Sequence, residues 1–160
     1  MTTTVQAGIT AGTPTNVAAF PAIAPGHHLA PVAIGGPGPD QKIVFVPCPD
    51  WCATNHISDW VHFLEDLDHT GEEFAVHVPS FFNEGVPVYT LSATVGCDPM
   101  STDPQMRAAH IVVGDEASVD AYQTPDMANE LAANLRKLAD KLDEAARTAR
   151  LHNQHAEAVA

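Results

Sequence analysis

Residues 48–56 read CPDWCATNH, which places two cysteines four residues apart and a histidine four residues further on. Thiolates and an imidazole at this spacing can converge on one tetrahedral metal ion, the geometry that zinc prefers in proteins. Pro49 stiffens the segment between the cysteines, because its ring fixes the backbone angle φ. The stretch therefore predicts a small domain organised around a metal-binding knuckle that contains Cys48, Cys52 and His56.

A closed structural zinc site has four protein ligands, so a fourth residue is needed. His69, in the run DHTG of residues 68–71, is the nearest candidate along the chain. Cys97, at the end of a predicted strand, and His77, in the middle of another, remain alternatives, whereas we expect His62 to be solvated. The predicted ligand set is Cys48, Cys52, His56 and His69.

The same cysteines allow other interpretations. Both could be small buried apolar residues, or they could form a reversible disulfide. Cys48 or Cys52 beside His56 could form a nucleophile and base, and a carboxylate near His69 could serve as general base at a hydrolytic metal. The sequence has no recognisable third orienting residue and no oxyanion-hole signature. We therefore favour a non-enzymatic protein and keep a metal- or thiol-dependent enzyme as the alternative.

The charge balance constrains the partners. The 160-residue chain has 7 basic and 20 acidic residues, a net charge of −13 and a pI near 4.8. Binding to nucleic acid or to an anionic membrane needs clustered lysine and arginine, so both partners are disfavoured. An acidic surface is compatible with a basic protein partner. A further alternative is an acidic decoy that blocks a nucleic-acid-binding surface on a host protein.

Cysteine usage bears on the compartment. The sequence has no apolar run of about 18 residues, which a membrane span requires, and its N-terminus lacks the basic stretch of a secretory signal. Three cysteines cannot all pair within one chain. This odd count favours the reducing cytoplasm over a disulfide scaffold, so we expect a cytoplasmic protein.

Composition divides the chain into three parts. Residues 1–40 are rich in Ala, Thr, Pro and Gly and show neither helical nor strand periodicity, which predicts a disordered arm. Residues 41–150 form the predicted single domain, and residues 151–160 form a predicted frayed tail. No internal repeat is visible in the sequence.

Within the domain, β-branched and alternating stretches predict a mainly antiparallel sheet. Ser58 is a candidate N-cap for a helix through Asp66, because the apolar residues that follow it recur at helical spacing. The predicted strands lie at residues 43–46, 74–78, 86–95 and 110–113, with a short edge strand at 119–122.

The C-terminal helix has the clearest local signals. Thr124 is a suitable N-cap, and Pro125 at the first helical position needs no backbone N–H. The apolar stripe that follows has Leu138 at its centre and most simply packs on the sheet, although a homodimer could bury whatever the sheet leaves uncovered. The predicted fold class is α+β: a small, mainly antiparallel sheet packed against one long C-terminal helix, with a metal-binding knuckle and a disordered N-terminal arm.

The knuckle also resembles a group of small uncharacterised actinobacterial and actinophage proteins built around the pattern Cys-Pro-x-Trp-Cys-x-x-x-His. Residues 48–56 match this pattern, and residues 69–71 match the His-x-Gly that is typical later in these chains. Residues 78–81 and 107–110 and the closing Thr-Pro helix look similar too. The resemblance covers about residues 43–146 and implies this domain architecture without an established activity.

These features together predict a non-enzymatic cytoplasmic binding or adaptor protein with a structural zinc site and a protein partner. A closed metal site beside an exposed apolar patch would favour such an adaptor. A pocket at an open metal position would instead favour an enzyme.

Overall fold

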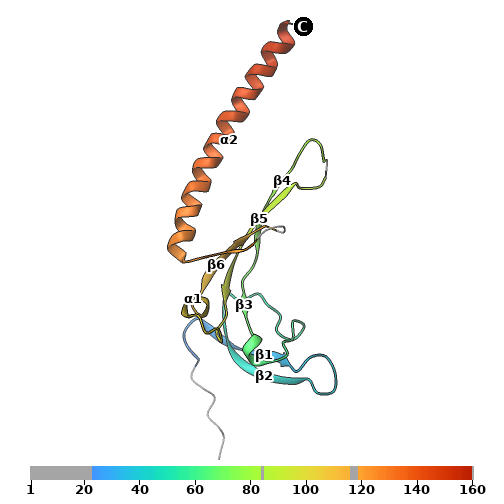
Figure 1. The fold of residues 1–160 in the computed structure, drawn as a ribbon, viewed down its shortest axis with the longest axis vertical. Helices are drawn as coiled ribbons and strands as arrows, with labels where there is room; N and C mark the ends of the chain where they lie inside the picture. Colours follow the sequence, from blue (N-terminus) through green and yellow to red (C-terminus); the bar gives the residue numbers. More distant parts are fainter. Residues whose placement is uncertain (1–22, 84, 116–118, 160) are drawn as a thin grey trace, which may run out of the picture.

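The computed structural model describes residues 23–83, 85–115 and 119–159. Two antiparallel sheets occupy one end of the molecule, and a single long C-terminal helix extends away from them (Figure 1). This arrangement confirms the predicted α+β class. Among the described residues, no helix combines the length and the apolar character that a membrane crossing requires.

The first sheet is a hairpin of β1 (His27–Ile34) and β2 (Lys42–Pro49), paired residue by residue along their full length. Gly35 makes the turn possible, because its φ is +89° and a Cβ there would lie 3.2 Å from the carbonyl oxygen of Asp40. Strand β1 lies inside the predicted disordered arm of residues 1–40, so that boundary is wrong. Residues 1–22 lie outside the described residues.

Composition predicts an arm here because proline, glycine and alanine are frequent, yet both faces of the strand are buried around Val32 and Ala33. Val32 and Ala33 are 0% exposed, although Pro31 stands directly before them. Pairing with β2 supplies the hydrogen bonds and the apolar cover that composition alone does not reveal. The strand therefore owes its stability to a partner that begins eight residues further along the chain.

The second sheet is built around β5 (Tyr89–Cys97). One edge of β5 pairs with β6 (His110–Gly114), which in turn pairs with β7 (Ala121–Gln123). The other edge pairs first with β4 (Phe74–Val78) and then with β3 (His69–Thr70). The short helix α1 (Pro104–Arg107) connects β5 to β6. The strands predicted at 74–78 and 110–113 are confirmed, whereas the one predicted at 86–95 begins only at Tyr89.

The predicted helix of residues 58–66 does not form, and only the 3₁₀ turn η1 (Leu64–Asp66) lies there. The backbone of Val61 explains the difference. Its N–H donates to the carbonyl of Ala33 at 3.0 Å, and its carbonyl accepts from the N–H of Gly35 at 3.0 Å. An α-helix would need these same groups for its own hydrogen bonds. Contact with the β1 end of the hairpin therefore overrides the local helical pattern.

A small apolar core lies between the β1–β2 hairpin and the segment that leads to β3. Its buried centre consists of Val32, Val46 and Leu67. Partly buried side chains pack around this centre, namely Ile34, Val44, Val61 and Leu64. The core thus joins the hairpin to the chain segment that carries His69 into the second sheet.

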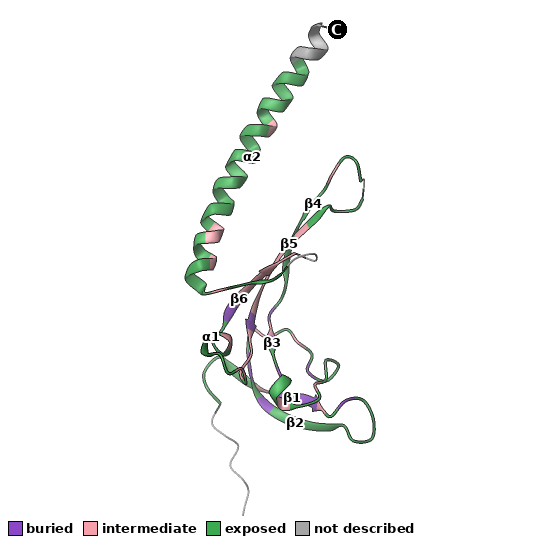
Figure 2. Cartoon of the chain, in the orientation of Figure 1, coloured by how far each residue is buried: buried purple, intermediate pink, exposed green. Residues whose placement is uncertain are grey.

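The long helix α2 (Pro125–Val159) begins as predicted, and the Thr124 hydroxyl accepts from the N–H of Met127 at 3.3 Å. It continues to Val159, so the helix includes residues 151–159 of the predicted tail, and the fraying of this tail stays a prediction. The helix contacts the sheet at β6 and β7, and most of its length is exposed (Figure 2). Leu138, predicted to be core, is 54% exposed, because the sheet does not extend that far along the helix.

Candidate metal centre

Four side chains that the sequence singles out meet at the junction of the two sheets. Cys48 lies at the end of β2, Cys52 and His56 lie in the turns that follow, and His69 begins β3. One ligand atom from each residue lies within 4.8 Å of the other three. The predicted convergence of these four residues is confirmed, while their role as metal ligands stays a prediction.

The separations within this cluster match the edges of a zinc tetrahedron. With Zn–S near 2.3 Å and Zn–N near 2.05 Å, tetrahedral angles place sulfur and nitrogen about 3.6 Å apart and two nitrogens about 3.3 Å apart. Cys48 Sγ lies 3.7 Å from His56 Nε2 and 3.6 Å from His69 Nδ1, and Cys52 Sγ lies 3.5 Å from His56 Nε2. The two imidazole nitrogens are 3.3 Å apart.

Backbone hydrogen bonds hold the ligand-bearing turns in place. The N–H of Cys52 donates to the Pro49 carbonyl at 3.0 Å, which closes the knuckle. The N–H of Ala53 donates to the Thr70 carbonyl at 2.8 Å, and Cys52 forms an antiparallel bridge with Gly71. These bonds tie the knuckle to β3. The cluster is therefore positioned by both sheets rather than by one flexible loop.

The turn that carries His56 is anchored separately. The side-chain oxygen of Asn55 accepts from the N–H groups of Ile57 and Ser58 at 3.1 and 3.3 Å. The carbonyl of His56 accepts from the N–H of Ala33 in β1 at 2.9 Å. An Asx turn and a strand contact thus fix the direction in which the imidazole leaves the backbone.

Burial sets the protonation of the cluster. Cys48, His56 and His69 are each at least 96% buried, and Cys52 is partly buried. Burial, and after it the neighbouring Cys52, raise the pKa of the Cys48 thiol to about 12. Burial also lowers the pKa of His56 and of His69, so both imidazoles are neutral near pH 7. Neutral imidazole is the form that coordinates a metal.

The alternative fourth ligands lie elsewhere. Cys97 pairs with His69 across the sheet, but its thiol donates to the carbonyl of Arg107 at 3.2 Å. His77 is exposed on β4 and lies 3.1 Å from the Thr90 hydroxyl. His62 is exposed beside Trp60, with ring centroids 5.1 Å apart. His69 is therefore the fourth member of the cluster.

The geometry bears on two chemical alternatives. All three cysteines are free in this structure. The carboxylates near His69 that could serve as a general base are exposed to solvent, and none belongs to the cluster. These carboxylates are Glu65, Asp66, Asp68, Glu72 and Glu73.

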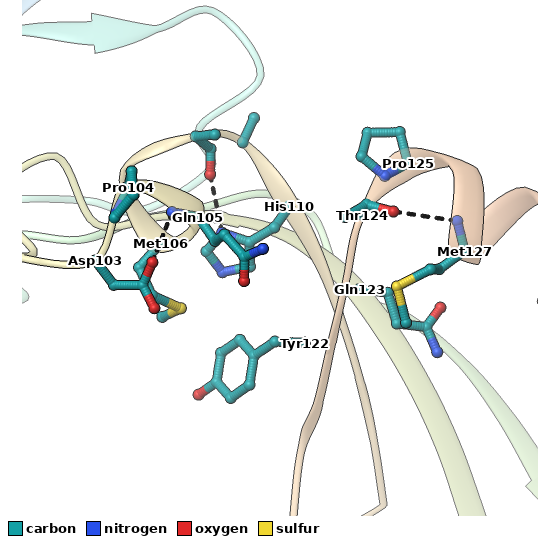
Figure 3. A pocket seen from close by; sticks show the side chains of 12 residues that line it. Asp103, Pro104, Gln105, Met106, His110, Tyr122, Gln123, Thr124, Pro125 and Met127 are labelled. Carbon is teal, nitrogen blue, oxygen red and sulfur yellow. Dashed lines mark hydrogen bonds between the residues drawn. The ribbon is translucent and has the colours of Figure 1, made fainter.

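A separate cleft of about 650 Å³ opens between α1, β7 and the start of α2 (Figure 3). His110 lines it, with Nδ1 2.9 Å from the carbonyl of Ala108 and its ring 5.6 Å from the ring of Tyr122. A Cβ at Gly96 would lie 3.1 Å from His110 Nε2, so the imidazole packs over a residue that has no side chain. No sequence pattern predicts this cleft, because its lining comes from two separate segments, residues 103–110 and 122–127.

Comparison with known proteins adds a family but no activity. A family model described as a domain of unknown function, DUF6907, matches residues 32–151, and the chain belongs to this family. No curated protein and no solved structure matches the chain. The family match begins within β1 and ends within α2, so it includes the cluster and both sheets.

Proposed function

We propose that this protein is a non-enzymatic binding or adaptor protein whose fold is stabilised by a structural zinc ion. The observation that carries the proposal is the buried Cys2His2 cluster with tetrahedral separations. Two thiolates and two imidazoles favour zinc over magnesium or calcium, which prefer oxygen ligands. Four protein ligands would also complete the zinc coordination shell and leave no position for a substrate water.

The place of the cluster in the fold suggests what the metal does. Cys48 belongs to the hairpin sheet and His69 to the second sheet, so one ion would link the two. Within the described part of the chain, the apolar core beside it has three buried side chains at its centre. Such a small core supplies limited stability, and small domains commonly compensate with a metal. Zinc binding here would therefore contribute directly to the free energy of folding.

The adaptor role rests on the opposite end of the second sheet. Several apolar residues of β4 and of the loop after it are exposed. We call them the β4 patch: Phe74, Val76, Val78, Phe81 and Phe82. The rings of Phe81 and Phe82 are in contact, with centroids 4.2 Å apart, and both are more than 80% exposed. A contiguous exposed apolar surface of this kind is typical of protein-binding sites. The net charge of −13 supports a partner with a basic surface.

The expected setting is the cytoplasm, where thiols stay reduced and available to zinc. An actinobacterial or actinophage source also remains a prediction from the knuckle pattern. An enzyme and an acidic decoy of nucleic acid remain the alternative functions. Each makes a different demand on the site, because an enzyme needs an open metal position and a decoy needs no metal at all.

Cobalt substitution separates these functions. We expect one Co²⁺ per chain, with the absorption bands of tetrahedral thiolate coordination and no spectral change on addition of azide or cyanide. A spectrum that shifts with these ligands would indicate an open position and would favour the enzyme. A chain that takes up no cobalt, with unchanged stability, would remove the structural-metal function. His77→Ala is the matched control, because His77 is exposed and outside the cluster.

A further inference from the structure

The apolar stripe of α2 has the spacing of a coiled coil. Its residues follow one another at alternating intervals of three and four, the pattern that keeps one seam facing a partner helix. Glu130, Arg136, Lys137, Asp140 and Lys141 lie off this seam. We call the stripe the α2 seam: Ala128, Leu131, Leu135, Leu138, Leu142, Ala145 and Ala149.

The protein's own sheet covers only the beginning of this seam. Leu131 and Leu135 line a groove of about 280 Å³ whose other wall includes Phe74 and Val76 of β4. Beyond the groove, Leu138 and Leu142 are 54% and 61% exposed, and α2 extends past the sheet into solvent (Figure 1). An isolated amphipathic helix of this kind gains little stability without a packed apolar face. Among the described residues, the outer part of the seam is therefore left available to a partner helix.

Charge indicates which partner fits. The chain as a whole is strongly acidic, yet five of its 7 basic residues lie in α2, together with six of its 20 acidic residues. Two α2 helices can therefore approach each other with little net repulsion. The remainder of the chain has only two basic residues, and two such acidic bodies repel when they are close.

We propose that α2 pairs with α2 of a second copy of this chain as an antiparallel two-helix coiled coil centred between Leu138 and Leu142. In this register each of these leucines faces the other across the two-fold axis. Leu135, the last leucine of the groove, then faces Ala145 of the second copy, so large and small side chains alternate along the outer part of the seam. The antiparallel direction also places the two acidic bodies at opposite ends of the paired helices.

The flank of the seam fits this arrangement. Alanine occupies the position directly after Leu131, after Leu138 and after Ala145. In an antiparallel pair these positions face the same positions of the second helix, so Ala139 lies opposite Ala139 of the second copy. Small residues on this side allow the two helix axes to approach closely. A parallel pair would leave these alanines apart from one another.

Sedimentation of the full chain tests the pairing. We expect a dimer, and we expect L138K combined with L142K to weaken its dissociation constant by roughly 100-fold or more, because two apolar contacts at the centre are replaced by charges. The helical content should fall together with the dimer, while amide spectra of β1 and β2 stay unchanged. Asp140→Lys is the matched control on the outer face of the same helix turn, and it should leave the dimer intact.

Cysteine crosslinking tests the direction. Ala139→Cys should form a disulfide with its own copy under mild oxidation, whereas Ala132→Cys should not, because its antiparallel neighbour is Ala146. A monomeric wild-type chain with fully helical α2 would overturn the proposal. A dimer that survives L138K with L142K, or that is lost instead in Phe81→Ser with Phe82→Ser, would also overturn it, since the interface would then lie elsewhere.

Discussion

The hairpin end and the extended end of this molecule use apolar side chains in opposite ways. The hairpin end contains both the buried core of Val32, Val46 and Leu67 and the Cys2His2 cluster. At the extended end, phenylalanine, valine and leucine side chains of the β4 patch and of the outer part of the α2 seam are exposed. We therefore propose that stability is concentrated at one end and that the other end serves contacts with further chains. The predictions that follow test this division, from the largest expected effect to the smallest.

The largest effect should come from a charge placed in the hairpin core. Val32→Asp puts a carboxylate at a position that is 0% exposed and should lower the free energy of unfolding by more than about 4 kcal/mol. Val76→Asp, at a position that is 65% exposed, is the matched control and should change it by less than about 0.5 kcal/mol. Urea unfolding of both variants measures the difference. If both variants lost the same free energy of unfolding, the two ends would not differ in their contribution to stability.

Metal removal should act on the same end. If free zinc exceeds its dissociation constant about 1,000-fold, a chelator should lower the free energy of unfolding by about 4 kcal/mol. The loss should appear first as faster amide exchange in β1, β2 and β3, because the cluster joins these strands. If amide exchange became faster by the same factor in α2 as in these strands, the metal would not act locally.

Zinc affinity should depend on pH. Because burial and the neighbouring Cys52 raise the pKa of the Cys48 thiol to about 12, this thiol is protonated at neutral pH in the metal-free protein, and zinc must displace its proton. Burial lowers the pKa of His56 and His69, so the imidazoles release no proton at neutral pH. Affinity should rise roughly tenfold per pH unit for each proton displaced. Calorimetry in two buffers of different ionisation enthalpy measures this release, and equal heats in both would contradict it.

The smallest effect concerns Leu138. Its exposure predicts that Leu138→Ala changes the stability of the hairpin end by less than about 0.5 kcal/mol, measured by amide exchange in β2. A buried core leucine would cost roughly 2–5 kcal/mol when truncated to alanine. A loss of that size in β2 would show that α2 packs on its own sheet after all.

The contrast between the ends also explains what the sequence could predict. The cluster was predictable because Cys48, Cys52 and His56 are close along the chain. Their spacing can be recognised in the sequence without knowledge of the fold. The start of α2 was predictable for the same reason, since Thr124 and Pro125 act within one turn. In both cases the interacting residues lie within a few positions of one another, so the sequence alone predicts the structure.

The errors arose where a distant partner decides the structure. Strand β1 depends on β2, and Val61 leaves its helical pattern because its backbone bonds to Ala33 and Gly35. The apolar stripe of α2 indicates a helix with a buried face, but it does not indicate whether the same chain or a second copy buries Leu138. Periodicity specifies a face and leaves its partner open.

Native mass spectrometry of the full chain, purified without chelator, tests the central claim most directly. We expect one zinc per chain in the wild type and in His77→Ala, and no zinc in His69→Ala or Cys52→Ser, together with a lower melting temperature in both of these variants. A metal-free wild type of unchanged stability would contradict the account, and so would zinc retained at full occupancy in both cluster variants.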